Sequence, residues 1–259
     1  MVTLDDIRQD VGKTVSRRGS DLLPGKSQYV CLRSLNLYQS PTCEGLVTQA
    51  AAGRYLKFAD IPENDSVPAL RVQICEDDYE GWLAIADLSH LTIAARPYKA
   101  PELNRAMVQQ RLPQAIAYSQ TAMAQPNQYR WGGTVPPHFD CSGLMQAAFA
   151  SAGVRLPRDS YQQEAFTQTI GLNELQPGDL IFFGTPKKTT HVALYLSAGK
   201  YIHSSGKDQG RNGIGIDSIW DLSDPIRHTY HQQIRCAGRV DRSYQPGDLA
   251  RLVQSRHWH

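Results

Sequence analysis

Short apolar runs separated by turn residues fill the first third of the chain. Six runs with the composition of strands occur between residues 28 and 94: Gln28–Leu32, Leu35–Tyr38, Gly53–Phe58, Ala69–Ile74, Gly81–Ala86 and Thr92–Ala94. Short strands at this spacing, bounded by turn residues, are typical of a small barrel. The pattern therefore predicts a small all-β barrel over residues 25–96, preceded by a polar segment at residues 1–24.

The pattern changes after residue 96. Residues 97–112 combine an extended, proline-containing path with the start of a helix-forming region, Leu103–Ala124. Because proline fits the first turn of a helix, we expect Pro113 to begin a new helix. The segment Leu144–Ala152 has apolar residues at helical spacing, and Gly153 after it suits a C-terminal cap.

A series of strand-like runs follows these helices: Asp179–Phe183, His191–Ser197, Lys200–Ser204 and Ile234–Val240. Helices followed by strands favour an α+β domain built on an antiparallel sheet. We place this domain at residues 113–242, with residues 97–112 as linker and leading helix and residues 243–259 as a C-terminal tail. A chain of 259 residues is long enough for two domains.

Composition and charge narrow the function classes. Hydrophobic residues make up 41% and charged residues 20%, as in ordinary globular proteins, and the net charge of +2 gives no reason to expect nucleic acid as a partner. No apolar stretch approaches the roughly 20 residues of a membrane span, and the N-terminus does not resemble a Sec signal. We therefore expect a cytoplasmic protein. A periplasmic or extracellular location stays open, and the oligomeric state is not predicted.

The cysteines indicate free thiols. The chain has five, an odd number, so at least one thiol is unpaired. They show no C-x-x-C pair, and we expect no zinc site, no other metal and no cofactor. Cys31 and Cys43 could form a disulfide in an oxidising compartment, but free thiols are the leading interpretation.

The candidate nucleophile is Cys141, which follows an extended run, Tyr129–Gly133, and opens the predicted helix. The N-terminus of a helix favours a thiolate over a thiol, and a thiolate beside an imidazole is a working nucleophile. His191 is the candidate base, and Tyr129 could place its hydroxyl beside the oxyanion of an acyl-transfer reaction. A buried cysteine at a helix start is more often a core residue, so the prediction depends on the joint pattern.

His203 is the candidate that orients the base. It lies twelve residues after His191, across a turn expected at Ser197–Lys200. A hairpin there brings the two imidazoles to the same end of adjacent strands, in a register that depends on any bulge. A neutral His203 that accepts a hydrogen bond from His191 would fix the tautomer that faces Cys141.

A series of motifs in the second half of the chain resembles, in order, the NlpC-type cell-wall cysteine peptidases: Tyr129–Gly133, Phe139–Leu144, Leu156–Gln163, Gln176–Phe183 and His191–Tyr195. The resemblance implies a papain-like fold from about Pro113 to Arg242. It also implies that Cys141 is the nucleophile, His191 the base and His203 the third polar residue, with the family tyrosine at Tyr129. Because these peptidases mostly cut amide bonds in peptidoglycan stem peptides, the expected partners are peptidoglycan-derived peptides.

Two phrases in the first part of the chain, Leu35–Pro41 and Glu80–Leu88, resemble the bacterial SH3-like domain. With this barrel ahead of the catalytic domain, the chain resembles the γ-D-glutamyl-L-diamino acid endopeptidases of muropeptide processing. In that subgroup the barrel helps to bind a free N-terminal L-alanine. The implied reaction is hydrolysis of the γ-D-glutamyl-L-diamino acid bond in murein recycling or turnover, and the sequence does not identify the diamino acid.

The same resemblance assigns four substrate-binding residues. Tyr79 is the contribution of the barrel, and its alternative interpretation is an ordinary exposed aromatic near a turn. Asp140 binds the ammonium group of the alanine, although a carboxylate beside the nucleophile opposes thiolate formation. Ser142 and Ser160 hold the carboxylate or backbone groups of the substrate.

Two loops and three other functions complete the predictions. The stretch Thr134–His138 is an insertion, interpreted as the rim of the cleft, and the Gly-rich loop Asp208–Gly215 has no role beyond a possible contribution to the diamino-acid subsite. The first alternative function is a lytic hydrolase of intact peptidoglycan that uses the barrel as a wall anchor. The others are a scaffold protein with an inactive catalytic domain and an acyltransferase.

Overall fold

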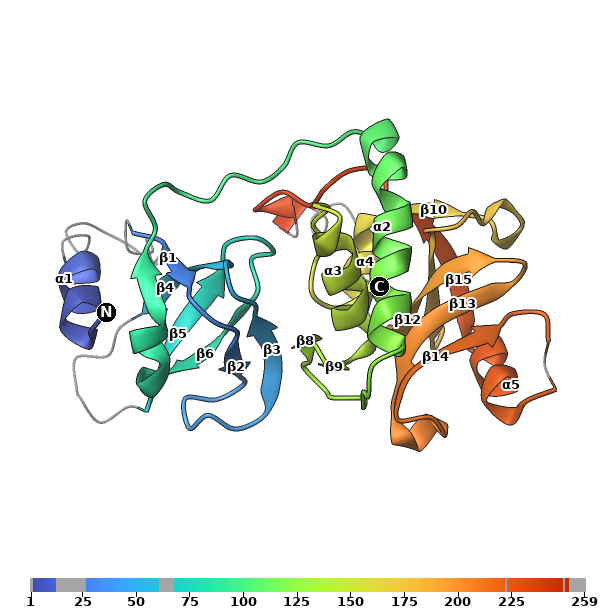
Figure 1. The fold of residues 1–259 in the computed structure, drawn as a ribbon, viewed down its shortest axis with the longest axis horizontal. Coiled ribbons are helices and arrows are strands. Elements are labelled where there is room, and N and C mark those ends of the chain that lie inside the picture. Colours follow the sequence, from blue (N-terminus) through green and yellow to red (C-terminus); the bar gives the residue numbers. More distant parts are fainter. Residues whose placement is uncertain (1, 13–26, 61–67, 222, 249, 252–259) are drawn as a thin grey trace. The chain divides into compact units, whose positions relative to one another are not determined.

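The structure is a computed structural model that describes residues 2–12, 27–60, 68–221, 223–248 and 250–251. The chain divides into two compact units, Met1–Lys99 and Ala100–His259 (Figure 1). Parts of the predicted segments at both ends of the chain lie outside the described residues. The exact boundaries of the five predicted segments stay predictions.

The first unit is built on an antiparallel sheet of seven strands in the order β3-β2-β6-β5-β4-β1-β7. Its elements in chain order are α1 (Leu4–Gly12), β1 (Tyr29–Cys31), β2 (Leu35–Tyr38), β3 (Leu46–Ala50), β4 (Tyr55–Asp60), β5 (Ala69–Ile74), β6 (Glu80–Ala84), the 3-10 helix η1 (Ile85–His90) and β7 (Leu91–Ile93). The prediction of an all-β sheet unit ahead of the second domain is confirmed.

Alternation of apolar and polar side chains explains most of this sheet. In β2, Leu35 and Leu37 are buried while the residues between and after them are only half-buried. The strand that sequence reasoning missed is β3, where the polar side chains of Thr48 and Gln49 are buried beside Ala50. Gln49 donates a hydrogen bond to Asn36 at 2.9 Å, which satisfies a polar group that the apolar pattern could not reveal.

The second unit contains the remaining helices and strands. They are α2 (Arg105–Met123), β8 (Thr134–Val135), β9 (His138–Phe139), α3 (Cys141–Ser151), α4 (Ser160–Phe166), β10 (Gln168–Ile170), η2 (Leu172–Glu174), β11 (Leu180–Gly184), β12 (Thr189–Ser197), β13 (Lys200–Ser205), η3 (Lys207–Gln209), β14 (Gly213–Ser218), α5 (Pro225–Gln232) and β15 (Ile234–Arg239). The main sheet is antiparallel and has six strands in the order β10-β15-β11-β12-β13-β14, and β8 and β9 form a separate hairpin. The predicted α+β class is confirmed.

Helices cover both faces of the six-stranded sheet (Figure 1). Successive residues of a strand point to opposite faces, so Phe182 and Val192 pack toward α2 and α3, whereas Phe183 and His191 face α5. The smaller core under α5 consists of Ile181, Phe183, Ala193, Tyr195, Tyr201, Ile219 and Tyr230. The two histidines of the predicted site therefore lie on the α5 side of the sheet.

The prediction that Pro113 starts a new helix is wrong, because Pro113 lies inside the continuous helix α2. This helix begins at Arg105, and the side chain of Asn104 caps it by accepting a hydrogen bond from the N–H of Met107 at 3.0 Å. Val108 and Ala115, on either side of the proline, are fully buried. Their packing holds the helix together across the one backbone hydrogen bond that proline cannot make.

The predicted tail also begins inside the folded unit. Ser243 accepts a hydrogen bond from the N–H of Arg155 at 2.9 Å, and the N–H of Tyr244 donates to the carbonyl of Arg155 at 2.9 Å. The ring of Tyr244 is fully buried, with its centroid 5.7 Å from that of Phe166. Residues 243 and 244 are therefore packed into the second unit.

Candidate active site

Cys141 is the first residue of α3, as the sequence predicts. Asp140 is the N-cap of this helix, and its Oδ1 accepts a hydrogen bond from the N–H of Gly143 at 2.7 Å. An extended stretch precedes the cap, with Tyr129 bridged to Phe139 and β8 paired with β9. The helix ends at Ser151, and Gly153 takes a positive φ of 71°, as expected for a C-terminal cap.

The candidate base and its partner lie diagonally on neighbouring strands. In the hairpin of β12 and β13, Leu194 pairs with Ile202, and the register shifts near the turn, between Tyr195 and Ser197. His191 and His203 therefore project from the same face of the sheet, and Nε2 of His191 lies 2.7 Å from Nδ1 of His203. The structure brings together the two histidines that the sequence selected.

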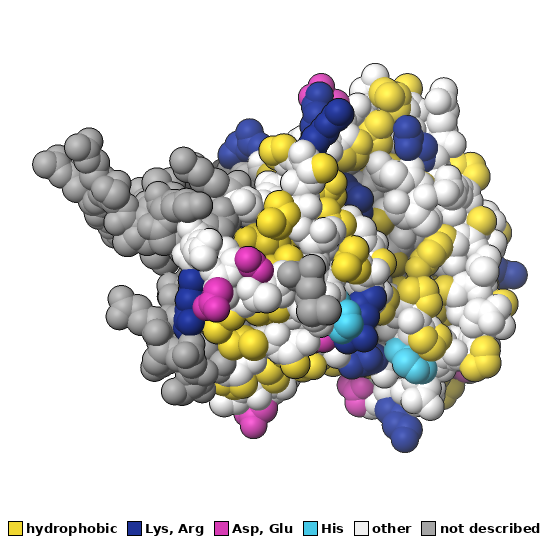
Figure 2. Space-filling model, turned by 60° about the vertical axis from the view of Figure 1, so that its left-hand side comes forward, with side chains coloured by type: hydrophobic (Ala, Val, Ile, Leu, Met, Phe, Trp, Pro, Cys, Tyr) yellow, Lys and Arg dark blue, Asp and Glu magenta, His cyan; other side chains and the backbone are white. Residues whose placement is uncertain are grey.

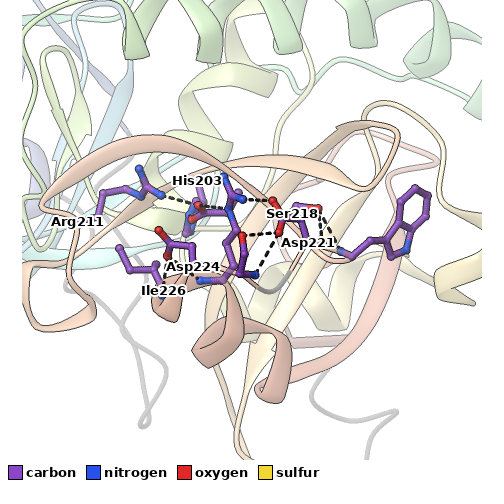
Figure 3. Close-up of polar contacts among 10 residues, drawn as sticks. His203, Arg211, Ser218, Asp221, Asp224 and Ile226 are labelled. Carbon is purple, nitrogen blue, oxygen red and sulfur yellow. Dashed lines mark hydrogen bonds and ion pairs between the residues drawn. The ribbon is translucent and has the colours of Figure 1, made fainter.

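A third strand extends this pair. His203 lies opposite Gly215 in β14, and Asp217, two residues further along, has its Oδ2 2.8 Å from Nε2 of His203. The side chain of Asp217 is almost fully buried, and its Oδ1 accepts a hydrogen bond from Arg211 at 2.6 Å (Figure 3). The sequence did not select Asp217, so the structure adds a carboxylate to the predicted arrangement.

The hydrogen-bond chain determines which ring nitrogens of His191 and His203 carry a proton. A carboxylate only accepts, so Nε2 of a neutral His203 must carry the proton that points to Asp217. Nδ1 of His203 is then an acceptor, and Nε2 of His191 must donate to it. Nδ1 of His191 is left with a lone pair. The tautomer of His191 that is able to take a proton is therefore fixed by Asp217, across His203.

Burial determines the charge states of the resting groups. Burial raises the pKa of the Cys141 thiol to about 12 and the charge of Asp140 acts in the same direction, whereas the N–H groups of Val192 and Ser142 and the charge of Arg158 oppose it. The pKa of His191 is well below its ordinary value because of burial and then of a positive charge on His203. The helix N-terminus was expected to favour a thiolate, but burial outweighs it. Each of the two pKa shifts favours the uncharged form of its group.

Two tyrosines lie within electrostatic reach of the thiol. Burial raises the pKa of Tyr129, and the next largest cause is a negative charge on Cys141, so the predicted tyrosine is near the nucleophile. Tyr230 of α5 also senses this charge. Its ring centroid lies 4.7 Å from that of His191 and 4.8 Å from that of His203, and its hydroxyl is 2.7 Å from Ser205.

Asp140 has partners that sequence reasoning missed. Arg158, which is only 1% exposed, contacts both carboxylate oxygens of Asp140 at 3.2 and 2.5 Å, and it donates to Oγ of Ser142 at 2.8 Å. The N–H of Gly132 also donates to Oδ2 of Asp140 at 2.9 Å. The carboxylate is thus a helix cap and half of a buried ion pair. The expected conflict between Asp140 and the thiolate is reduced because Arg158 balances the charge.

The other predicted residues lie in separate places. Ser160 is buried in the first turn of α4. Tyr79 is half-buried between β5 and β6 of the first unit. His138 of the predicted rim belongs to β9, and its Nδ1 accepts a hydrogen bond from the N–H of Gln128 at 3.1 Å. The loop 208–215 contains the end of η3 and the start of β14.

A signal existed in the sequence for two of the missed residues. Gly213, Gly215 and Asp217 occupy every second position, as the buried residues of a strand do. This segment was interpreted as a loop because of its glycines. Arg158 lies inside a motif that was recognised, and a buried Asp140 needs a partner of opposite charge. Tyr230 had no such signal, since α5 is a short polar helix.

The described parts of the chain contain no group of three or more His, Cys, Asp or Glu side chains arranged to hold a metal ion. None of the helices in these parts is long and apolar enough to cross a membrane. Figure 2 shows a face on which basic and acidic side chains occur in several separate places among hydrophobic and uncharged ones.

Two protein families match separate parts of the chain. The NlpC/P60 family matches residues 126–240, and the bacterial dipeptidyl-peptidase SH3 domain matches residues 37–88. The first match includes Cys141, His191, His203 and Asp217. The second lies entirely within the all-β unit.

Individual relatives cover only parts of the chain. The probable endopeptidase p60 of Listeria seeligeri is 41% identical over 91 residues, which are 35% of this chain and 16% of that protein. The bifunctional muramidase/DL-endopeptidase CwlT of Bacillus subtilis is 35% identical over 130 residues, 48% of this chain and 40% of that protein. This chain thus spans less than half the length of either relative.

Among solved structures, an NlpC/P60 family protein from Bacillus cereus is 23% identical, with a TM-score of 0.45, covering 82% of this chain and 63% of the other. The two family matches, each inside one of the two compact units, define the organisation of the chain. Residues 126–240 form an NlpC/P60 domain, and residues 37–88 ahead of it form a bacterial SH3 domain of the dipeptidyl-peptidase kind.

Proposed function

We propose that the protein is a cysteine endopeptidase that hydrolyses the γ-D-glutamyl-L-diamino acid amide bond of peptidoglycan stem peptides with a free N-terminal L-alanine. The observation that carries the proposal is the ordered arrangement at the start of α3 and on the facing strands. There, Cys141 lies near the N–H of Val192, and the preceding residue, His191, is bonded to His203. A buried thiol beside an oriented imidazole has the parts that acyl transfer requires.

The geometry supports a general-base attack. Nδ1 of His191 takes the proton of the Cys141 thiol as Sγ bonds to the carbonyl carbon of the scissile amide. The hydroxyl of Tyr129 is the candidate donor to the resulting oxyanion. The tetrahedral intermediate then expels the amine of the diamino acid, which receives the proton held by His191, and a thioester forms. Water, deprotonated by His191, hydrolyses the thioester and restores the thiol.

The choice of substrate rests on the relatives and on the arrangement of domains. The Bacillus subtilis relative is named a DL-endopeptidase, and the bond between D-glutamate and an L-diamino acid joins a D centre to an L centre. The SH3 domain ahead of the peptidase domain resembles the organisation of endopeptidases that act on short muropeptides. Both features support murein recycling or turnover as the setting of the reaction.

Four residues are proposed to bind this substrate. Asp140 binds the alanine ammonium, which then shares the carboxylate with Arg158, so the three charges form a row of alternating sign. Ser142, already bonded to Arg158, and Ser160 would bind the carboxylate or backbone groups. Tyr79 is the contribution proposed for the SH3 domain. A capped amine has no positive charge to pair with Asp140, so a capped peptide should bind less well than a free one.

Mass spectrometry of the products tests the proposal. L-Ala-γ-D-Glu-meso-diaminopimelate, its N-acetylated form and the L-lysine analogue are incubated with the protein, with intact sacculi in parallel. We expect release of the diamino acid from the free peptides and little reaction with the acetylated form. Release from sacculi at an equal rate would favour the lytic hydrolase instead. No cleavage of any of the four substrates would contradict the proposed function.

A further inference from the structure

We infer that Asp217 is a positioning residue for the base, acting through His203, and that Arg211 and Arg227 control how strongly its negative charge reaches the two imidazoles. The inference rests on the proposed function, because it assigns a role within the same reaction. Asp217 touches neither the nucleophile nor, in the proposed mechanism, the substrate.

The first observation is the unbroken chain across three strands. The side chains of His191, His203 and Asp217 lie on one face of β12, β13 and β14, joined by contacts of 2.7 and 2.8 Å. His203 is 0% exposed and Asp217 2% exposed, so water does not compete for these bonds. If Asp217 were replaced by a hydrogen-bond donor, His203 would have to turn its lone pair to the donor. Nδ1 of His191 would then become the protonated nitrogen, which cannot act as a base.

The second observation is the pair of arginines around the carboxylate. Arg211 donates to Oδ1 of Asp217 at 2.6 Å (Figure 3). Nε of Arg227 lies 3.6 Å from the same oxygen. Arg227 also pairs with Asp221, whose side chain is 54% exposed. Burial alone would raise the pKa of Asp217, but the bonds from His203 and Arg211 outweigh it and lower the pKa. The carboxylate therefore stays ionised at neutral pH.

The third observation concerns the place of Arg211. It belongs to the Gly-rich loop that sequence analysis left without a role, and its guanidinium lies against Gly215, the residue opposite His203. A Cβ at position 215 would clash with Nη1 of Arg211, so a side chain there would displace the guanidinium. The glycine makes room for a positive charge beside the imidazole chain.

The charges around the imidazoles act in opposite directions. Asp217 favours a positive charge on His203 and His191, which is the state His191 reaches when it has taken the thiol proton. Burial is the main cause of the lowered pKa of His203, and the charge of Arg211 adds a smaller effect in the same direction. The rings of Tyr201 and Tyr230 pack against these imidazoles, Cys141 acts on Tyr230, and Arg227 lies beside Asp217. Among the described residues, Asp217 is the carboxylate that acts on the pKa of both imidazoles.

This balance predicts opposite effects of two substitutions on the pH profile. Asp217→Asn removes the negative charge, so protonating His191 becomes harder and the acid limb moves to lower pH. Arg211→Gln leaves the carboxylate less neutralised, so the acid limb moves to higher pH. Gly215→Ala should resemble Arg211→Gln, because it displaces the same guanidinium. If the ion pair had a purely structural role, Asp217→Asn and Arg211→Gln would not shift the acid limb in opposite directions.

The alkylation rate of Cys141 by iodoacetamide, measured against pH, reports the coupled thiol and imidazole without any substrate. In the same variants, peptide hydrolysis gives kcat and KM. We expect Asp217→Asn to lower kcat about 10–100-fold with little change in KM, as for other groups that orient a first ligand or base. Asp179→Asn is the matched control, since it removes a buried carboxylate that pairs with Arg239 and does not act on the pKa of either imidazole, and its profile should match the wild type.

Chemical rescue provides a second test. A surface hollow of about 480 Å³ adjoins the carboxylate and is lined in part by Asp217, Ser218, Trp220 and Arg227. In Asp217→Ala, formate can reach the vacated position and restore a carboxylate beside His203. We expect sodium formate to raise the rate of Asp217→Ala severalfold over sodium chloride at the same ionic strength. The wild type, which already has its carboxylate, should not respond.

The outcomes separate this inference from the proposed function. Absence of hydrolysis by the wild type would reject the peptidase, whereas the alkylation profiles would still test the role of Asp217. An unchanged profile in Arg211→Gln and Gly215→Ala would overturn the inference even if Asp217→Asn failed to fold. A shift of the same sign in Asp217→Asn and Arg211→Gln, or the absence of formate rescue in a folded Asp217→Ala, would also overturn it.

Discussion

Two buried aspartate–arginine pairs belong to the candidate site, one on the side of the nucleophile and one on the side of the base. Asp140 and Arg158 lie at the start of the helix that carries Cys141, with a bidentate contact at 3.2 and 2.5 Å. Asp217 and Arg211 lie at the edge of the sheet behind His203, with a single contact at 2.6 Å. The two pairs have the same chemical components but different third partners.

These third partners give the pairs different roles. Asp140 accepts from the backbone N–H groups of Gly132 and Gly143, so it joins the loop before the nucleophile to the helix that carries it. Asp217 accepts from the imidazole of His203, which contacts His191, the residue whose charge changes during the reaction. The first pair should therefore determine stability, the position of the thiol and, in the proposed function, the binding of the alanine ammonium. The second should determine mainly the protonation of the base.

The largest expected effect belongs to the nucleophile itself. Cys141→Ala should lower hydrolysis by about 10⁴-fold or more, since loss of a nucleophile removes most of the acceleration that acyl-transfer enzymes achieve. Both ion pairs should survive, so the urea midpoint should stay near that of the wild type. Initial rates and urea unfolding check this. Cys236→Ala is the control, and retained activity in Cys141→Ala would exclude the proposed mechanism.

The second effect tests the ion pair of Asp140 and Arg158. Arg158→Met leaves Asp140 buried without its counter-charge, which should cost about 3–5 kcal/mol of unfolding free energy. Arg242→Met, which breaks an ion pair with Asp248 whose arginine is 40% exposed, should cost less than about 1 kcal/mol. Urea unfolding of both variants gives the comparison. Equal losses would mean that burial of the Asp140 pair has no special importance.

Sequence reasoning found the groups that react and missed the charges that surround them. Cys141 was predictable from the helix start, and the pairing of His191 with His203 from a hairpin with a turn at Ser197–Lys200. Arg158 and Asp217 were missed because a charged residue in a sequence is normally assigned to the surface. Only the folded structure shows that these two are enclosed.

The fold shows the same division. The helix α3 and the strands β11, β12, β13 and β15 were predicted from their apolar periodicity. The strand β14 was missed because its buried face consists of Gly213, Gly215 and Asp217, which give no apolar signal. The continuity of α2 through Pro113 depends on tertiary packing, which local propensity does not include.

The third effect tests the connection between the base and its neighbour. His203→Ala leaves Nε2 of His191 without its partner and frees the ring to adopt either tautomer. We expect kcat to fall about 10–100-fold, with KM nearly unchanged, because His203 does not bind the substrate in the proposed mechanism. Steady-state kinetics on L-Ala-γ-D-Glu-meso-diaminopimelate measure both constants. A rise in KM alone would assign His203 to substrate binding.

The smallest effect, and the sharpest test of the comparison, is on the alkaline limb of the pH profile. The reacting pair needs one proton in total, so activity falls at low pH when a second proton is added to His191 and at high pH when the thiol proton is lost. Asp140 raises the pKa of Cys141 by its negative charge, and burial has a larger effect in the same direction. Asp140→Asn should therefore move the alkaline limb to lower pH by about one unit, since one neighbouring charge is removed while burial is unchanged.

The matched control for this variant is Asp179→Asn. Asp179 is 2% exposed and also pairs with an arginine, Arg239, at 2.9 and 2.7 Å, but it does not act on the pKa of Cys141. Both variants should lose stability, because each replaces a buried charged partner with an amide. Alkylation of the folded protein by iodoacetamide, which becomes faster as Cys141 loses its proton, reports the same pKa independently of that loss. Only Asp140→Asn should move it. Equal shifts in the two variants would mean that the alkaline limb reports unfolding, and the electrostatic difference between the two pairs would then have no support.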